Sequence, residues 1–207
     1  MKLYTTVKKQ AKAEQIIEKS RFICYVSPAE SKEEADEFIA SIKKMNKDAT
    51  HNVPAMVLGD KMQIQWASDD GEPQGTSGAP IVQMLVNEGI TNVVIVVTRY
   101  FGGIKLGTGG LVRAYTSSAK LGLQEAQICD VSLKTVLTYE LDYTHLSRVQ
   151  NLEKEGGFKI SDIGYEAKVK IKMILDEDHL EELKNSLANI TNGTGNVISI
   201  EKIVVKA

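Results

Sequence analysis

The sequence has little cysteine, no excess of either charge and no long apolar run. Its two cysteines among 207 residues, Cys24 and Cys129, lie in apolar segments without metal-ligand spacing, which predicts buried thiols in a reducing compartment. The net charge of −2 gives no sign of a nucleic-acid ligand in the composition. No apolar run reaches the roughly 20 residues that span a bilayer, and the N-terminus does not resemble a signal peptide. We therefore expect a cytoplasmic protein with no membrane partner and, if it binds anions, a local binding surface.

Motifs that mark familiar catalytic sites are also missing. The chain contains no G-x-x-x-x-G-K-[ST] phosphate loop, and the G-x-G run at Gly107 and Gly109 has Val112 where a dinucleotide fingerprint needs glycine. The three histidines are scattered. His145 and His179 are interpreted as surface residues, and only His51, which precedes a predicted strand, is kept as a site candidate. We expect a non-enzymatic protein, and we assign it no catalytic residues, cofactor or metal.

Residues 1–130 read as one α+β domain. One strand is expected over Glu14–Ser27, and Ser31 with Glu34 forms a capping box that opens the first helix. Thr76 or Ser77 is expected to cap the second helix. The remaining predicted elements are strands in "VPAMVLGD", "MQIQWASDD" and "TNVVIVVTRY", the last apolar on both faces and hence central, and a long helix in "GTGGLVRAYTSSAKLGLQEA".

Residues 131–207 form a second predicted domain with the order β-α-β-β-α-β, which is the ferredoxin-like pattern. Thr144 is expected to cap its first helix, Gly156-Gly157 to end that helix, and a hairpin to turn around Gly164. The hairpin strand "AKVKIKMIL" alternates, so its lysines and its apolar residues are expected on opposite faces: Lys168, Lys170 and Lys172 against Val169, Ile171 and Met173.

Glycine is concentrated in one window, where nine of the 16 glycines fall between Gly71 and Gly110. In "RYFGGIKLGTGGLVRA" a strand ends, a glycine loop follows and a helix begins near Gly109. Unsatisfied amides and the helix dipole make such a start a natural anion site, although the glycines are also explained by tight turns and close packing alone. The candidate phosphate-binding or nucleic-acid-binding residues are Arg99, Tyr100, Gly102, Gly103, Lys105, Gly107, Thr108, Gly109, Gly110 and Arg113.

The preceding segment, "SDDGEPQGTSGAP", carries Asp69, Asp70 and Glu72 in a turn. Paired carboxylates can hold a cation or act as acid and base. The favoured interpretation is structural: the acids cap the next helix and pair with nearby cations of the glycine loop.

Together these segments carry a resemblance. The strings "DDGEPQGTSGAPI" and "VVTRYFGGIKLGTGGLVRAY", with the flanking "KSRFI" and "ATHN", resemble the signature of the Impact family in its bacterial YigZ-like branch. The resemblance implies an N-terminal domain similar to the second domain of a small-subunit ribosomal protein, of left-handed β-α-β type, and a C-terminal domain similar to the ferredoxin-like last domain of elongation factor G. It points toward RNA, ribosomes and translational control, and it supplies no catalytic residues.

The leading hypothesis is a non-enzymatic protein that binds RNA or the ribosome and modulates translation. Arg99, Lys105 and Arg113 would contact phosphates, and Tyr100 or Phe101 would stack on a base. Both aromatic residues are also candidates for the core, Phe101 slightly more so.

Two alternatives stay open. One is a nucleotide-binding or phosphate-binding enzyme or sensor that uses the glycine loop of residues 102–113 as a phosphate cradle, with the acidic turn bringing a divalent metal. The other is a regulator that binds a protein partner through the sheet face or edge of the C-terminal domain.

Overall fold

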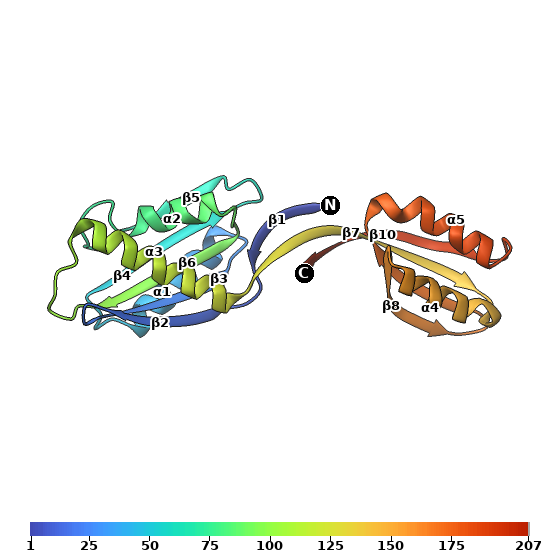
Figure 1. The fold of residues 1–207 in the computed structure, drawn as a ribbon, viewed down its shortest axis with the longest axis horizontal. Coiled ribbons are helices and arrows are strands. Elements are labelled where there is room, and N and C mark those ends of the chain that lie inside the picture. Colours follow the sequence, from blue (N-terminus) through green and yellow to red (C-terminus); the bar gives the residue numbers. More distant parts are fainter. Residues whose placement is uncertain (207) are drawn as a thin grey trace. The chain divides into compact units, whose positions relative to one another are not determined.

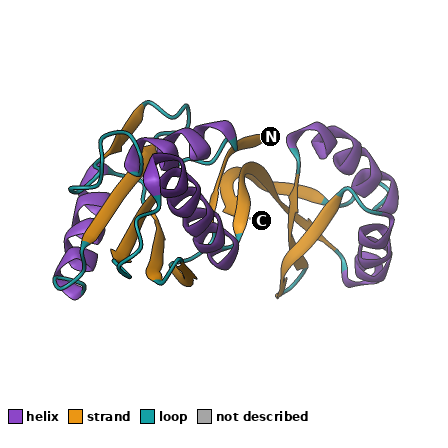
Figure 2. Cartoon of the chain, turned by 60° about the vertical axis from the view of Figure 1, so that its left-hand side comes forward, coloured by secondary structure: helices purple, strands orange, loops and turns teal. Residues whose placement is uncertain are grey.

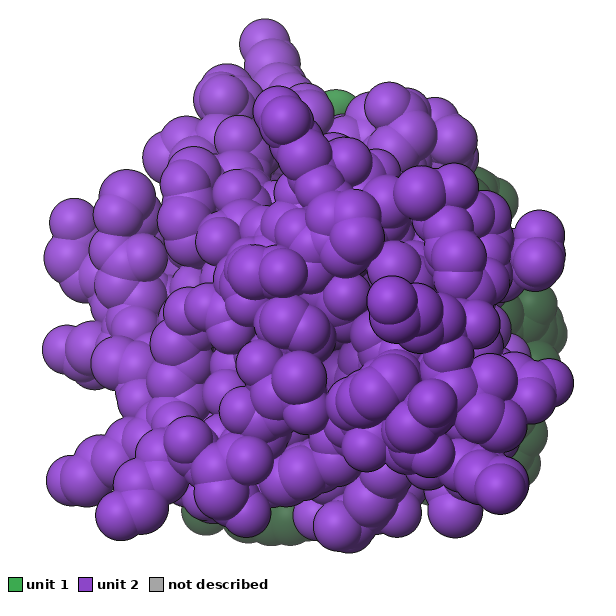
Figure 3. Space-filling view, turned by 90° about the vertical axis from the view of Figure 1, so that its left-hand side faces the viewer, with its two compact units in different colours: residues 1–3, 131–207 green, residues 4–130 purple. Residues whose placement is uncertain are grey.

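The structure is a computed structural model that describes residues 1–206. The chain forms two compact units, shown in Figure 1 and coloured separately in Figure 3. Residues 4–130 make up the N-terminal unit, and residues 1–3 with 131–207 make up the C-terminal unit. The predicted α+β class with two domains is confirmed.

The N-terminal unit is a five-stranded sheet between two layers of helix (Figure 2). The strand order is β2-β3-β6-β4-β5, and every neighbouring pair is antiparallel. Helices α2 and α3 cover one face of the sheet, and α1 covers the other. In chain order the elements are β1 (Lys2–Val7, its first two residues counted with the other unit), β2 (Ala11–Ile17), β3 (Ser20–Pro28), α1 (Lys32–Met45), β4 (His51–Leu58), β5 (Ile64–Ala67), α2 (Gly78–Asn87), β6 (Val93–Tyr100) and α3 (Gly107–Ala126).

The central strand β6 is buried on both faces, as its unbroken apolar sequence predicts. Val93, Ile95 and Val97 belong to the core under α2 and α3. Val94 and Val96 belong to the core under α1. Because successive strand residues point to opposite faces, one β-branched run supplies both cores. Arg99 and Tyr100 are the last two residues of β6, directly before the glycine loop.

The segment predicted as one strand over 14–27 is instead the hairpin β2–β3. Glu18 and Lys19 form its two-residue turn, with φ of 46° and 63°. A two-residue turn with both φ values positive matches the strand twist, but it is usually marked by Asn or Gly. Two ordinary charged residues adopt it here, so the sequence carried no turn signal. Both cysteines are buried free thiols, as predicted.

Strand β4 contains a proline in its interior, Pro54, which lies opposite Val96 of β6. On the other side β5 pairs only from Ala55 onward, and the Pro54 carbonyl accepts a hydrogen bond from the Ser68 amide at 3.2 Å. A residue's amide and carbonyl point to the same side of a strand, so the missing N–H of Pro54 faces away from β6 and removes no bond from that ladder.

The capping box of α1 is present. Ser31 Oγ accepts the Glu34 amide at 3.2 Å, and the Glu34 carboxylate accepts the Glu30 amide at 2.8 Å. The carboxylate thus reaches one residue further back than the usual motif, and the predicted helix start is confirmed.

The C-terminal unit has the predicted β-α-β-β-α-β order. Its antiparallel sheet runs β10-β7-β9-β8, with β1 also placed beside β7, and both helices share one core with one sheet face. Short 3-10 turns precede each helix. The elements are β7 (Ile128–Leu141), α4 (Leu146–Glu155), β8 (Phe158–Tyr165), β9 (Val169–Leu175), α5 (Leu180–Ile190) and β10 (Asn196–Lys206).

Two local predictions in this unit are wrong. Thr144 does not cap α4, because it lies within a 3-10 turn and His145 takes the N-cap position. Gly164 is not the hairpin turn; it pairs with Lys170 inside the ladder, and the chain reverses at residues 166–168. The predicted alternation of β9 is confirmed, with Ile171 buried and Lys172 exposed.

Candidate functional site

The glycine loop joins the end of β6 to the start of α3, as predicted. Gly103 and Gly107 have φ of 88° and 68°, a region that favours glycine. Gly102 is required for a different reason, since a Cβ there would lie 2.0 Å from the carbonyl carbon and oxygen of Lys19. The loop therefore packs directly on the backbone of the β2–β3 turn.

Helix α3 begins without a side-chain cap. Leu106 holds the N-cap position and accepts no capping hydrogen bond through its side chain, while Gly107, Thr108 and Gly109 are exposed. The first amides of a helix lack intrahelical acceptors, and the dipole makes this end positive. An exposed and uncapped start thus offers hydrogen-bond donors to an anion.

Ser77 holds the N-cap position of helix α2, as predicted, but the side chain that accepts the amides of its first turn is that of Asp69. Its carboxylate accepts the amides of Gly75, Ser77 and Gly78 at 2.7, 3.2 and 2.9 Å and the Ser77 hydroxyl at 2.6 Å. Thr76 instead donates its hydroxyl to the Pro73 carbonyl at 2.6 Å. Burial alone would raise the pKa of Asp69, but the hydrogen bonds, that of Ser77 foremost, lower it below its ordinary value.

Asp70 is also occupied by structural contacts. Its carboxylate accepts the Asn52 amide at 2.7 Å and pairs with Lys43 at 2.6 Å. Within residues 1–206, no group of three or more His, Cys, Asp or Glu side chains is arranged to hold a metal ion. The divalent metal of the enzyme alternative therefore lacks such a ligand group in the described chain.

Glu72 and Arg99 form a buried ion pair, with side chains only 3% and 6% exposed. Arg99 Nη1 donates to Glu72 Oε1 at 2.7 Å, and the Tyr115 hydroxyl donates to the same oxygen at 2.7 Å. Burial, and then the charge of Glu72, raises the pKa of Tyr115, which keeps this hydroxyl a donor. Arg99 was predicted to contact phosphate at the surface; here it is held inside by the acidic segment.

His51 joins this cluster from β4, where it lies opposite Arg99 in the ladder with β6. Its Nδ1 is 2.8 Å from the Asp70 carbonyl oxygen, and its Nε2 is 3.8 Å from Glu72 Oε2. The side chain is 18% exposed. The structure thus places the one retained histidine beside the acidic segment and Arg99.

A pocket of about 430 Å³ lies above this cluster, and we call it the Phe101 pocket. Its polar floor is made by His51, Glu72 and Arg99, and its rim includes Lys105. Its walls are mostly apolar, and the other lining residues are Thr50, Pro73, Phe101, Leu106, Gly107, Thr108 and Leu111.

Phe101 is 47% exposed, so the expectation that it is core is wrong. It follows the last residue of β6, outside the sheet, and the Arg99 guanidinium lies 5.3 Å from its ring centroid. Tyr100 points to the opposite layer, against the α1 core, and its hydroxyl donates to Asp48 at 3.3 Å. Of these two aromatic residues, only Phe101 lines the Phe101 pocket and is therefore placed to stack on a ligand there.

Arg113 lines a second pocket, of about 470 Å³, which we call the Arg113 pocket. Lys105 and Leu106 line both pockets, so the two hollows adjoin. Gly110 and Ile104 also belong to the second one. The glycine loop thus carries two neighbouring depressions, one with an exposed aromatic ring and one with an arginine.

Sequence reasoning missed Tyr115, the second donor to Glu72. The signal was present, because Leu111, Ala114, Tyr115 and Ser118 recur at helical spacing on the buried face of α3. A buried tyrosine usually finds a partner for its hydroxyl, and the acidic turn is the partner here.

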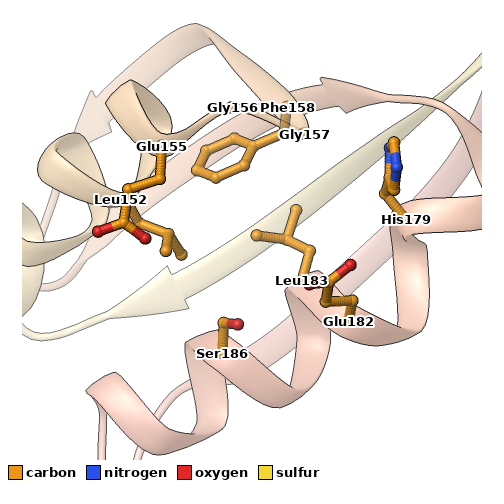
Figure 4. A pocket seen from close by; sticks show the side chains of 9 residues that line it. All are labelled: Leu152, Glu155, Gly156, Gly157, Phe158, His179, Glu182, Leu183 and Ser186. Carbon is orange, nitrogen blue, oxygen red and sulfur yellow. The ribbon is translucent and has the colours of Figure 1, made fainter.

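The C-terminal unit has a pocket of about 350 Å³ between α4 and α5 (Figure 4). Leu152, Phe158 and Leu183 form its apolar part, and Glu155 and Glu182 stand at its edges. The predicted lysine face is present but paired: Lys170 with Glu166 at 2.8 Å and Lys172 with Asp162 at 3.6 Å. Neither this pocket nor the paired lysine face offers the exposed helix amides and unpaired cations that the glycine loop offers.

Comparison with known proteins places this site in a family. Residues 18–123 match the Impact N-terminal domain, and residues 140–194 match a domain of unknown function, DUF1949. No helix in the described chain is long and apolar enough to cross a membrane.

Relatives agree along nearly the whole chain. IMPACT family member YvyE of Bacillus subtilis (strain 168) is 40% identical over 94% of this chain and 89% of its own. IMPACT family member YigZ of Escherichia coli (strain K12) is 34% identical over 90% and 92%. A crystal structure of a hypothetical protein, 32% identical, matches with a TM-score of 0.60 over 97% of this chain and 98% of its own. The chain belongs to the Impact family, and the predicted resemblance is confirmed.

Proposed function

We propose that this protein is a non-enzymatic, cytoplasmic RNA-binding protein that modulates translation, and that single-stranded RNA binds along the Phe101 and Arg113 pockets. The observation that carries the proposal is the adjacency of the two pockets, which share Lys105 and Leu106. An extended chain with repeating phosphates and bases fits two adjoining hollows, whereas one small phosphate compound fills only one.

The phosphate contacts come from the start of α3 and the loop cations. Gly107 and Thr108 line the Phe101 pocket next to Lys105, and Arg113 lines the neighbouring one. Within residues 1–206, neither Lys105 nor Arg113 takes part in an ion pair with a carboxylate. Their charges are therefore available to a ligand, in contrast to the charge of Arg99.

The base contact comes from Phe101. Its ring is nearly half exposed and has the Arg99 guanidinium beside it. Stacking on one aromatic side chain contributes about 1–3 kcal/mol per base and tolerates any base. We therefore expect the protein to bind RNA with little sequence preference.

The small number of phosphate-contacting cations sets the salt dependence of RNA binding. With two phosphate-contacting cations, log K should fall with log salt at a slope of only about −1.4, from roughly −0.7 per contact on single strands. This shallow slope distinguishes a small local footprint from a broad basic surface.

The test is fluorescence anisotropy with a 12-nucleotide single-stranded RNA, followed by sedimentation with purified ribosomes. The double variant Lys105→Ala, Arg113→Ala should bind RNA about tenfold more weakly, which corresponds to roughly 1.4 kcal/mol. Its RNA affinity should also no longer fall with salt at the slope expected for the native protein. The matched control is Lys44→Ala, Lys61→Ala, which removes the same charge from exposed positions outside both pockets. Equal weakening in both double variants, or no RNA binding by the native protein, would contradict the proposal.

A further inference from the structure

The floor of the Phe101 pocket holds two hydrogen-bond acceptors side by side, Nε2 of His51 and Oε2 of Glu72, 3.8 Å apart. A carbonyl oxygen can only accept, so the 2.8 Å contact of Nδ1 with the Asp70 carbonyl places the ring hydrogen on Nδ1. In its uncharged form the ring then presents Nε2 as an acceptor.

The Glu72 carboxylate is used on one side only. Oε1 accepts both of its protein donors, Arg99 Nη1 and the Tyr115 hydroxyl. Among the described residues, no protein donor hydrogen-bonds Oε2, the oxygen on the side of His51. The carboxylate is therefore fixed in orientation from behind, with its second oxygen left to a ligand.

A ligand group that satisfies both acceptors has to be a donor. A cation is disfavoured, because Arg99 already balances the charge of Glu72 at 2.7 Å and a second positive group would meet the guanidinium. A neutral hydroxyl fits: its one hydrogen is donated to either acceptor or, because they lie only 3.8 Å apart, is shared between the two in a three-centre hydrogen bond.

The same pocket has an aromatic wall at Phe101 and amide donors at Gly107 and Thr108. A base on the ring and a phosphate at the helix start leave the sugar between them, over the polar floor. The sugar hydroxyl that is present in RNA and absent from DNA is the ribose 2′-OH, and it would lie over this floor.

We propose that His51 and Glu72 make this site selective for RNA over DNA by accepting a hydrogen bond from a ribose 2′-hydroxyl. The inference rests on the proposed RNA-binding function and adds to it the residues that discriminate the sugar. His51 and Glu72 thereby act as specificity-determining residues at the floor, while Lys105 and Phe101 supply contacts that RNA and DNA share.

The experiment compares three 12-mers with identical bases by fluorescence anisotropy: oligouridine, oligodeoxyuridine and 2′-O-methyl oligouridine. The native protein should bind oligouridine about three- to tenfold more tightly than either of the others, the range expected for the net gain from one hydrogen bond. This comparison needs no variant, so it holds even where a substitution impairs folding.

Two substitutions then measure the share of His51 Nε2 in this effect. In His51→Asn the amide nitrogen replaces Nδ1 and keeps the bond to Asp70, but nothing replaces Nε2. The preference for oligouridine should therefore shrink to the part that Glu72 Oε2 supplies, and the affinity for oligodeoxyuridine should stay unchanged. In His51→Gln the amide reaches toward the Nε2 position, and part of the preference should return. Circular dichroism and thermal melting check the fold of both variants.

The outcomes separate the two proposals. Equal affinity of the native protein for the ribo and deoxy strands, or an equal loss for both strands in His51→Asn, overturns the sugar selectivity and leaves RNA binding standing. Failure to bind any of the three strands overturns both.

Discussion

The two units of this protein differ in where their ion pairs lie. In the C-terminal unit, lysines pair with carboxylates at the surface, as Lys172 does with Asp162, both side chains more than half exposed. The N-terminal unit also has surface pairs, such as Lys120 with Glu88, but it adds the buried pair of Glu72 with Arg99. The surface cations of the glycine loop have no carboxylate partner among the described residues. A chain of nearly neutral net charge can therefore carry a local anion site, because the charge of Arg99 is neutralised in the interior while Lys105 and Arg113 stay unpaired.

The largest expected effect comes from breaking the buried pair. Glu72→Ala leaves the Arg99 guanidinium buried without a counter-charge and removes the acceptor of Tyr115, which should lower the free energy of unfolding by about 3–5 kcal/mol. The single tryptophan, Trp66, lies in β5 of the N-terminal unit, so urea unfolding followed by its fluorescence reports on this unit.

The matched change in the C-terminal unit is Lys172→Ala, which removes one partner of an exposed pair. The expected change is within about 0.5 kcal/mol, read from far-ultraviolet circular dichroism. Equal destabilisation by Glu72→Ala and Lys172→Ala would show that the two units do not differ in the way described.

A smaller effect is expected from the glycine loop. Gly102→Ala drives a Cβ into the Lys19 backbone and should cost about 1–3 kcal/mol by overpacking, with weaker RNA binding as the loop shifts. Gly109→Ala is the control, because its Cβ would lie 3.6 Å from Arg113 Nη1 and alanine favours the helix by up to about 1 kcal/mol. The same tryptophan assay checks both, and a neutral Gly102→Ala would refute the steric role of Gly102.

A further effect, smaller than that of Gly102→Ala, concerns the cap of α2 and depends on pH. Removing it in Asp69→Ala should cost about 0.5–2 kcal/mol at neutral pH. The folded-state pKa of Asp69 is lowered, so the charge-dependent part of this stabilisation is complete above the ordinary pKa and is lost as the pH falls through the folded value. The difference between the native protein and the variant should shrink below about pH 4; a gap that widens on acidification would contradict the assignment.

Local patterns in the sequence were sufficient to predict most elements. The capping box at Ser31, the doubly buried strand β6 and the strand–loop–helix order of the glycine segment all depend on neighbours within a few residues. The turn at Glu18 and Lys19 was not predictable, because its left-handed conformation is imposed by strand twist and not by the residue types.

The site was only partly predictable. The sequence brought out the glycine loop and the acidic turn and favoured their pairing, but it did not say which acid pairs with which cation. Which acid would face which cation depends on contacts between distant segments: Glu72 reaches Arg99 across 27 positions and Tyr115 across 43. Periodicity has no access to such distances, so the burial of Arg99 and the position of His51 emerge only from the fold.

The proline inside β4 has a consequence for how faithfully this site is assembled. Shifting β4 by one residue along β6 would turn the missing N–H of Pro54 into the shared ladder, where a hydrogen bond would be lost. The same shift would move His51 away from its position opposite Arg99. Pro54 therefore penalises the misaligned sheet more than the correct one, so a residue outside the pocket helps to ensure that each folded molecule carries the same floor.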